Sequence, residues 1–159
     1  MICVCEVHLM EKAVQIAAEN VTSLHGGPFG AIVVKDGNII AIGRNEVTSS
    51  NDPTAHAEIQ AIRAACKALN TFQLDNCEIY TSCEPCPMCI GAIYWARPRA
   101  VYYAGTKEDA AKVGFDDQFI YEQIALPMEE RTISMKQIPL DQNTLPFSIW
   151  ESTMTKTEY

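Results

Sequence analysis

The sequence predicts an α/β fold in which a mixed β-sheet is covered by helices on both faces. Segments with helical spacing of apolar residues alternate with short apolar runs, in the order helix, hairpin, helix, strand, helix, strand, helix. The 159 residues are 48% hydrophobic and 20% charged, which is enough apolar material for the packed core of one domain. Because no repeat, low-complexity tract or linker interrupts the chain, we expect residues 1–159 to form a single domain.

The first half of the chain predicts a long helix followed by a β-hairpin. Apolar residues recur at spacings of three and four from residue 7 to residue 24, and the segment His25-Gly26-Gly27-Pro28 then breaks the helix. Two apolar runs, 31–34 and 39–42, flank Asp36-Gly37-Asn38, which is a hairpin signal.

The remaining elements follow from the same signals. Asp52-Pro53-Thr54 predicts a helix start, and apolar residues keep the helical period up to residue 69. Residues 77–80 and 100–103 predict strands on either side of a helix over 87–96. Further on, the patterns predict helices near 107–113 and 119–126, a fifth strand near 132–138 and a helix after Pro146.

Two short motifs predict a metal centre. His56 and Glu58 lie at the expected start of the second helix, and Cys86 and Cys89 lie at the expected start of the third. The partial positive charge of a helix N-terminus lowers the pKa of a thiol, and two thiolates with one imidazole suit zinc. We therefore expect His56, Cys86 and Cys89 to hold one Zn²⁺ ion per chain.

The other cysteines leave two alternative sites open. Cys83 could complete a closed, structural zinc site with the three ligands, and a C-x-x-C pair could instead be redox-active. A closed site would leave Glu58 without a role, whereas three ligands beside a carboxylate are typical of catalytic zinc. We therefore expect Cys83 to be a small buried residue. The seven cysteines do not resemble a disulfide framework, and Cys3 and Cys5 have no predicted role.

The combination of H-x-E with P-C-x-x-C is typical of zinc-dependent deaminases. Zinc lowers the pKa of a bound water to about 7, and Glu58 is predicted to carry the proton from that water to the substrate. Loss of ammonia needs a further proton, for which Asp116 and Asp117 are the candidate donors in the second half of the chain. Paired acids of this kind are also common as solvated or helix-capping residues.

Longer stretches resemble the cytidine-deaminase-like superfamily. They are GGPFGA at 26–31, NDPTAHAE at 51–58, TSCEPCPMC at 81–89 and GAIYWARP at 91–98. GFDD at 114–117, EERTI at 129–133 and the final Tyr159 are similar to the small bacterial guanine deaminases within it. The resemblance implies a three-layer α/β/α sandwich around a five-stranded mixed sheet, and hydrolysis of guanine to xanthine and ammonia.

The resemblance also implies roles for individual residues. It matches His56, Cys86 and Cys89 to the zinc ligands and Glu58 to the proton carrier. It places Asn45 and Ala57 in hydrogen-bonding positions and Phe29 and Trp95 as pocket walls. It matches Asp117 to a carboxylate that binds the substrate and also serves the leaving amine. It further implies a homodimer that exchanges a C-terminal segment of about residues 144–159, so that Tyr159 closes the partner's site.

The charge balance favours a small purine base over nucleic acid as the partner. Lys and Arg number 12 against 20 Asp and Glu, a formal net charge of −8, whereas nucleic-acid binding needs basic surface. A guanosine deaminase, a tRNA wobble-adenosine deaminase and a non-catalytic zinc-stabilised interaction domain remain as alternatives. No signal-peptide pattern and no apolar run of membrane-spanning length is found, so we expect a cytoplasmic protein without a membrane partner.

Overall fold

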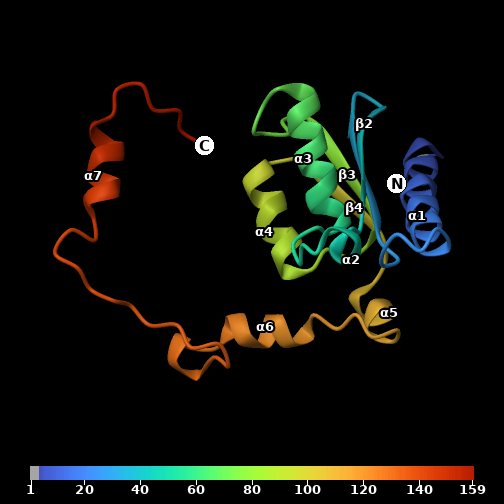
Figure 1. Ribbon diagram of the computed structural model, residues 1–159. Helices are drawn as coiled ribbons and strands as arrows, with labels where there is room; N and C mark the ends of the chain where they lie inside the picture. The colour runs from blue at the N-terminus through green and yellow to red at the C-terminus, as the bar shows by residue number, and fades with distance from the viewer. Residues whose placement is uncertain (1–3) are drawn as a thin grey trace. The chain divides into compact units, whose positions relative to one another are not determined.

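The computed structural model describes residues 4–159 and has a mixed sheet at its centre (Figure 1). The sheet order is β2-β1-β3-β4, with β1 at Gly30–Lys35, β2 at Asn38–Arg44, β3 at Cys77–Cys83 and β4 at Ala100–Gly105. Strand β1 pairs antiparallel with β2 and β3, whereas β3 and β4 are parallel. The hairpin and the strand–helix–strand unit are therefore both as the sequence predicts.

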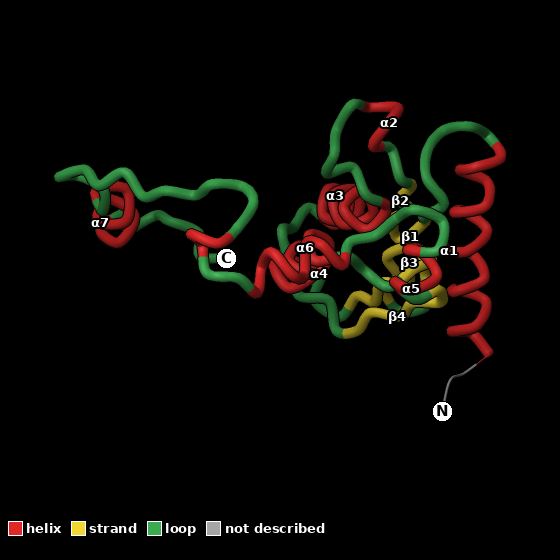
Figure 2. Tube along the Cα trace, turned by 90° about the horizontal axis from the view of Figure 1, so that it is seen from below, coloured by secondary structure: helices red, strands yellow, loops and turns green. Residues whose placement is uncertain are grey.

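Helices cover both faces of this sheet, which confirms the predicted layering (Figures 1 and 2). Helix α1 (Val4–Thr22) packs on one face, and α3 (Ala57–Leu69) and α4 (Pro87–Ala96) lie on the other. Alternate residues of β1 enter two separate core clusters. Ala31 and Val33 pack with α3 and α4, whereas Ile32 and Val34 pack with α1. Both faces of β1 are buried, which is why its sequence is a continuous apolar run.

Helix α3 approaches the sheet unusually closely at Gly43 of β2. A Cβ at Gly43 would overlap the backbone carbonyl of Ala57 and the backbone nitrogen of Ala61. The facing residues of α3 are also small, since Ala57, Ala61 and Ala65 are all fully buried. Because no larger side chain can separate the two elements, the first turn of α3 has a fixed place on the sheet.

The predicted start of α3 is wrong by about one helical turn. The carboxylate of Asp52 accepts hydrogen bonds from the backbone nitrogen of Thr54 (2.8 Å) and from its hydroxyl (2.7 Å). These local bonds hold a turn instead of starting a helix. The helix begins at Ala57 with His56 as its N-cap, and an unpredicted short helix α2 (Val47–Ser50) precedes it.

The predicted fifth strand is also wrong, because the described residues form a sheet of four strands. Residues 132–138 follow the short 3-10 helix η1 (Met128–Glu130) without regular structure. Arg131 donates to the backbone carbonyls of Leu126 and Ile124, and the backbone nitrogen of Thr132 donates to Gln123. The start of this segment is thus tied to the preceding helix and not to a neighbouring strand.

The chain divides into two compact units, one reaching to Phe119 and the other spanning Ile120–Tyr159. The first contains the sheet, α1 to α4 and α5 (Lys107–Ala111). Helix α6 (Gln118–Ala125) continues into the second unit, which also contains α7 (Leu145–Ser152). Helices α5, α6 and α7 match the predicted ones to within a few residues. None of residues 120–159 is buried, and no described helix is long and apolar enough to cross a membrane.

Candidate metal centre and active-site pocket

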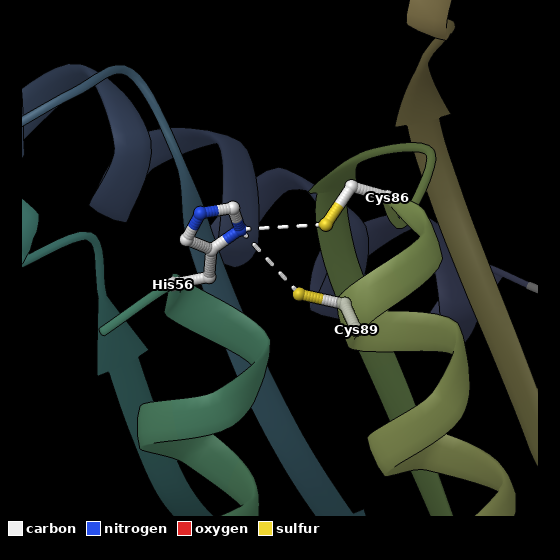
Figure 3. Close-up of side chains that lie close together, drawn as sticks. All are labelled: His56, Cys86 and Cys89. Carbon is white, nitrogen blue, oxygen red and sulfur yellow. Dashed lines mark hydrogen bonds between the residues drawn. The ribbon is translucent and has the colours of Figure 1, made fainter. Parts of the chain in front are cut away.

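Three side chains from two helix N-termini converge on one point (Figure 3). His56 is the N-cap of α3 and Cys86 is the N-cap of α4, both with extended backbone. Cys89 lies one turn further into α4 and is fully buried. Pro87 at the start of α4 suits the fixed backbone of a first helical turn, so the P-C-P-x-C sequence itself sets this geometry.

The spacing of the three ligand atoms fits a tetrahedral zinc ion. Nδ1 of His56 lies 3.5 Å from Sγ of Cys86 and 3.6 Å from Sγ of Cys89, and all three ligand atoms lie within 4.8 Å of one another. Zinc bonds of about 2.3 Å to sulfur and about 2.0–2.1 Å to nitrogen at tetrahedral angles give sulfur–nitrogen separations of about 3.5–3.6 Å. Two cysteine sulfurs and one imidazole nitrogen therefore lie at zinc-binding distance.

Hydrogen bonds among these three side chains shift their pKa values. The hydrogen bond from Cys89 lowers the pKa of Cys86 to about 4, and the same bond raises the pKa of Cys89. The hydrogen bond with Cys86 raises the pKa of His56. One thiolate is therefore present before any metal binds, while the second thiol keeps its proton until a cation replaces it.

Glu58 lies beside this group and is not part of it. Among the described residues, the potential metal-binding group around this point consists of the histidine and the two cysteines alone. Glu58 is in the first turn of α3, is 6% exposed, and Oε2 accepts a hydrogen bond from Sγ of Cys89 at 3.5 Å. Burial raises the pKa of Glu58 above its usual value. A carboxyl group whose pKa is raised by burial exchanges protons closer to neutral pH than an exposed one does.

A cavity of about 690 Å³ opens next to these residues. Six of the predicted site residues line it, namely Phe29, Asn45, His56, Glu58, Cys86 and Asp117. All of them belong to the first compact unit. The structure thus brings together residues from five separate stretches of the sequence around one space.

The two neighbouring acids differ in their surroundings. Asp116 lines the cavity, but its carboxylate accepts a hydrogen bond from the backbone nitrogen of Gln118 (2.9 Å), as a helix-capping residue does. Burial raises the pKa of Asp117. The negative Cys86 thiolate nearby adds to this shift. Asp117 therefore holds its proton more tightly than an ordinary aspartic acid does.

Besides the metal ligand Cys89, three predicted site residues do not line the cavity. Ala57 is fully buried in the core, where its side chain packs between α3 and the sheet. Trp95 lies on α4 and is 64% exposed. Tyr159 is part of the second unit, where its ring lies edge-on to Trp150 with ring centroids 6.4 Å apart.

The structure also adds residues that the sequence reasoning missed. Phe115 lines the cavity and packs edge-on against Phe29, with ring centroids 4.9 Å apart at 89°. Glu84 lines it as well and accepts a hydrogen bond from the backbone nitrogen of Lys107 (3.3 Å). Both lie next to residues that the motifs single out, which is the one signal that could have revealed them.

Cys83 is buried, as expected, and lies outside the metal-binding group. It is 9% exposed, and its thiol donates to the backbone carbonyl of Thr106 at 3.5 Å. Burial raises its pKa to about 11, so that it is a neutral thiol at physiological pH. A closed site with four protein ligands is therefore not what this arrangement forms. Cys3 lies outside the described residues.

Comparison with known proteins identifies the family to which this chain belongs. The family model of the cytidine and deoxycytidylate deaminase zinc-binding region matches residues 5–105. The chain belongs to this family. As a member of a zinc-binding deaminase family, it is a zinc-dependent hydrolase, with His56, Cys86 and Cys89 positioned for one zinc ion.

Relatives within this deaminase family differ in how much of the chain they match. Guanine deaminase of Bacillus subtilis (strain 168) is 59% identical over 150 residues, which cover 94% of this chain and 96% of that protein. A crystal structure of the Bacillus subtilis guanine deaminase superposes with a TM-score of 0.94 and 58% identity, covering 96% of this chain and 97% of that chain. The tRNA-specific adenosine deaminase of Agrobacterium fabrum is 44% identical over 60% of this chain and 62% of its own length.

Zinc binding should become tighter as the pH rises. The raised pKa of Cys89 means that the metal must displace a proton at neutral pH, so at least one proton is released on binding. The apparent zinc affinity should therefore rise at least about tenfold per pH unit between about pH 6 and pH 8. Competition with a chelator of known affinity measures this slope, and a pH-independent affinity would contradict it. Cys66→Ser, outside the metal-binding group, is the control and should show the same slope.

Proposed function

We propose that the chain hydrolyses guanine to xanthine and ammonia. The observation that carries the proposal is the buried Glu58 beside a three-ligand zinc group, at the wall of a cavity large enough for a purine. Likeness over 94% of the chain to a guanine deaminase, against 60% for a tRNA-specific adenosine deaminase, supports guanine as the base.

The proposed reaction depends on proton transfer by side chains of this chain. Zinc, when bound, supplies Lewis acidity that lowers the pKa of a water molecule to about 7. Glu58 accepts the proton of that water and delivers it to the ring nitrogen next to the carbon that carries the amine. Its burial raises its pKa and keeps solvent from competing for the proton. The oxygen of the water bonds to that carbon, its second proton passes to the amine, and the C–N bond breaks, so that ammonia leaves and the ring carbon keeps the oxygen.

Asp117 is proposed to bind the donor edge of guanine and to assist the leaving amine. The guanine ring presents N–H and amine donors that a carboxylate accepts, whereas adenine lacks this combination. Asp117 faces the cavity, and its raised pKa suits a group that both accepts and returns a proton. Phe29 and Phe115 supply an apolar corner of the cavity, and we propose that the base packs against it.

The second compact unit is proposed to act in a homodimer. None of its residues is buried, and its exposed apolar side chains include Ile138 (79%), Phe147 (72%) and Met154 (96%). An isolated helix as short as α7 is marginal in water, so it needs a surface to pack on. We propose that about residues 144–159 are exchanged between subunits, with Tyr159 covering the partner's cavity and Trp95 and Ala57 contributing to the completed site.

Guanosine remains the second candidate substrate, because one observation favours it. The cavity of about 690 Å³ lies within the range of about 300–1,000 Å³ that is typical for drug-sized ligands, and so leaves volume for a nucleoside. An exchanged tail would fill part of that volume and favour the free base.

A substrate panel tests the proposed function. Ammonia release should be fastest with guanine when guanine, guanosine, adenine, cytosine and a tRNA stem-loop are compared under one set of conditions. Glu58→Gln should lower guanine turnover by about 10²–10⁴-fold, since it removes the acid/base group, and should retain one zinc ion. Zinc content is measured on the same samples. Loss of zinc from this variant would instead make Glu58 a ligand.

Asp117→Asn should impair guanine turnover far more than Asp116→Asn. The amide keeps the size of the side chain but replaces one acceptor oxygen with a donor, so that guanine donors face a donor. A site built to pair such groups discriminates by about 10⁴-fold or more, and we expect a loss of at least about 10²-fold in kcat/KM. Thermal unfolding controls for damage to the fold. A silent Asp117→Asn together with a damaging Asp116→Asn would assign the role to the other acid.

Mixed dimers test the exchanged tail. Deleting residues 155–159 should leave zinc binding intact and strongly reduce guanine turnover. Adding a full-length Glu58→Gln chain should restore part of the activity, because one site of the mixed dimer then has an intact Glu58 and a donated tail. Demonstrated mixed dimers without rescue would mean that the tail covers its own subunit. Full activity of the shortened chain alone would mean that the tail has no role in turnover.

A further inference from the structure

A buried amide at the end of α1 has no part in the mechanism above. Asn20 is fully buried and packs under the loop that follows α1, although it does not line the cavity. Burying an amide without hydrogen bonds costs stability, so a buried Asn is expected to make polar contacts with its surroundings.

The side-chain amide of Asn20 joins two segments that line the cavity. Nδ2 donates to the backbone carbonyl of Gly27 at 2.8 Å and to the backbone carbonyl of Asn45 at 2.9 Å. Both acceptors are carbonyl oxygens, so only the NH₂ end of the amide can face them. Oδ1 is buried without a partner, which leaves the two donor contacts as the side chain's polar function.

The first segment is the turn that carries Phe29. The carbonyl of Gly27 also accepts a hydrogen bond from the backbone nitrogen of Phe29 at 2.8 Å. Asn20 therefore fixes the peptide group around which this turn closes. The aromatic wall that meets Phe115 is positioned by the same turn.

The second segment is the end of β2, where Asn45 follows the last strand residue. Its backbone nitrogen donates to the carbonyl of Phe29 at 3.2 Å, so the two segments also bond to each other. They touch so closely that a Cβ at Gly26 would overlap the Asn45 carbonyl oxygen. Asn20 binds the same Asn45 carbonyl oxygen that Gly26 packs against.

The backbone thus held determines which end of the Asn45 side chain faces the cavity. Oδ1 of Asn45 accepts from the backbone nitrogens of Gly27 (3.3 Å) and Val47 (3.4 Å). With the oxygen committed to these two donors, the Nδ2 end is left to donate a hydrogen bond to a ligand in the cavity.

We propose that Asn20 is a positioning residue for the purine. It fixes the Gly27 and Asn45 peptide groups, and through them the Asn45 amide donates to an acceptor atom of the base from a fixed place beside the Phe29 wall. The inference rests on the proposed function, since it assigns a role in binding the base. The mechanism predicts that loss of Asn20 weakens binding of the base and leaves zinc and the Glu58 chemistry in place.

The test compares Asn20→Ala, Asn45→Ala and the double variant. Asn20→Ala should raise KM for guanine about tenfold while kcat changes by less than about threefold, because the lost contact acts on binding and not on proton transfer. The double variant should be only slightly worse than Asn45→Ala alone, because Asn20 acts through Asn45. Guanine binding by the same variants in a Glu58→Gln background, measured by calorimetry, should show the same pattern without turnover.

Ile16→Val is the matched control. Ile16 is buried on the same helix and packs in the core cluster on the α1 face of the sheet, away from the cavity. Its variant should lower the thermal stability and leave KM unchanged. If Asn20→Ala does not fold, Asn20→Ser, which keeps one donor hydrogen, replaces it and should give an intermediate KM.

Three results would overturn the inference. The first is a KM for the Asn20 variants equal to that of Ile16→Val. The second is a full additional loss when Asn20→Ala is combined with Asn45→Ala, since independent effects add. The third is a fall in zinc content in Asn20→Ala, which would place its effect at the metal. An unaltered chain that neither binds nor deaminates guanine would overturn the proposed function itself, and that result is separate from the other three.

Discussion

The close packing of α3 against β2 is the constraint on which the rest of the site depends. Gly43 leaves no room for a side chain between strand and helix, and the alanines of α3 that face it are as small as a helix allows. The first turn of α3 therefore cannot shift along or away from the sheet without loss of core contacts. Since His56 and Glu58 lie at the start of that turn, one metal ligand and the buried carboxyl beside it have a fixed position as well.

The second helix N-terminus is held by a different means. Strands β3 and β4 are parallel, so the chain between them must cross over the sheet, and α4 forms that crossover. Cys86 and Cys89 are thus presented at the end of β3, beside the start of α3 (Figure 3). Two helix termini with partial positive charge point at one place, which favours thiolates there, and a cation bound between two adjacent thiolates offsets their mutual repulsion.

Polar groups at and near the cavity differ in their surroundings. Glu58 is buried and Asp117 is half-buried, and loss of solvent raises the pKa of both carboxyl groups. Asn20 is fully buried but binds only backbone carbonyls, and its contacts run to the loop and to Asn45. The forty residues of the second unit have the opposite character, with no buried residue and many exposed apolar side chains. This character supports the proposed exchange of a C-terminal segment between subunits.

The sequence by itself determined the metal ligands, the carboxylate beside them, most of the helices and the four strands, because these follow from local spacing and periodicity. H-x-E and P-C-x-x-C need only two helix starts, and Pro87 sets one of them. The tertiary structure decided the rest. Asp52 bonds locally and moves the start of α3 to Ala57, and Arg131 ties the predicted fifth strand to α6. The link from Asn20 to Asn45 spans 25 residues, and a hydrogen bond between distant segments leaves no period in the sequence.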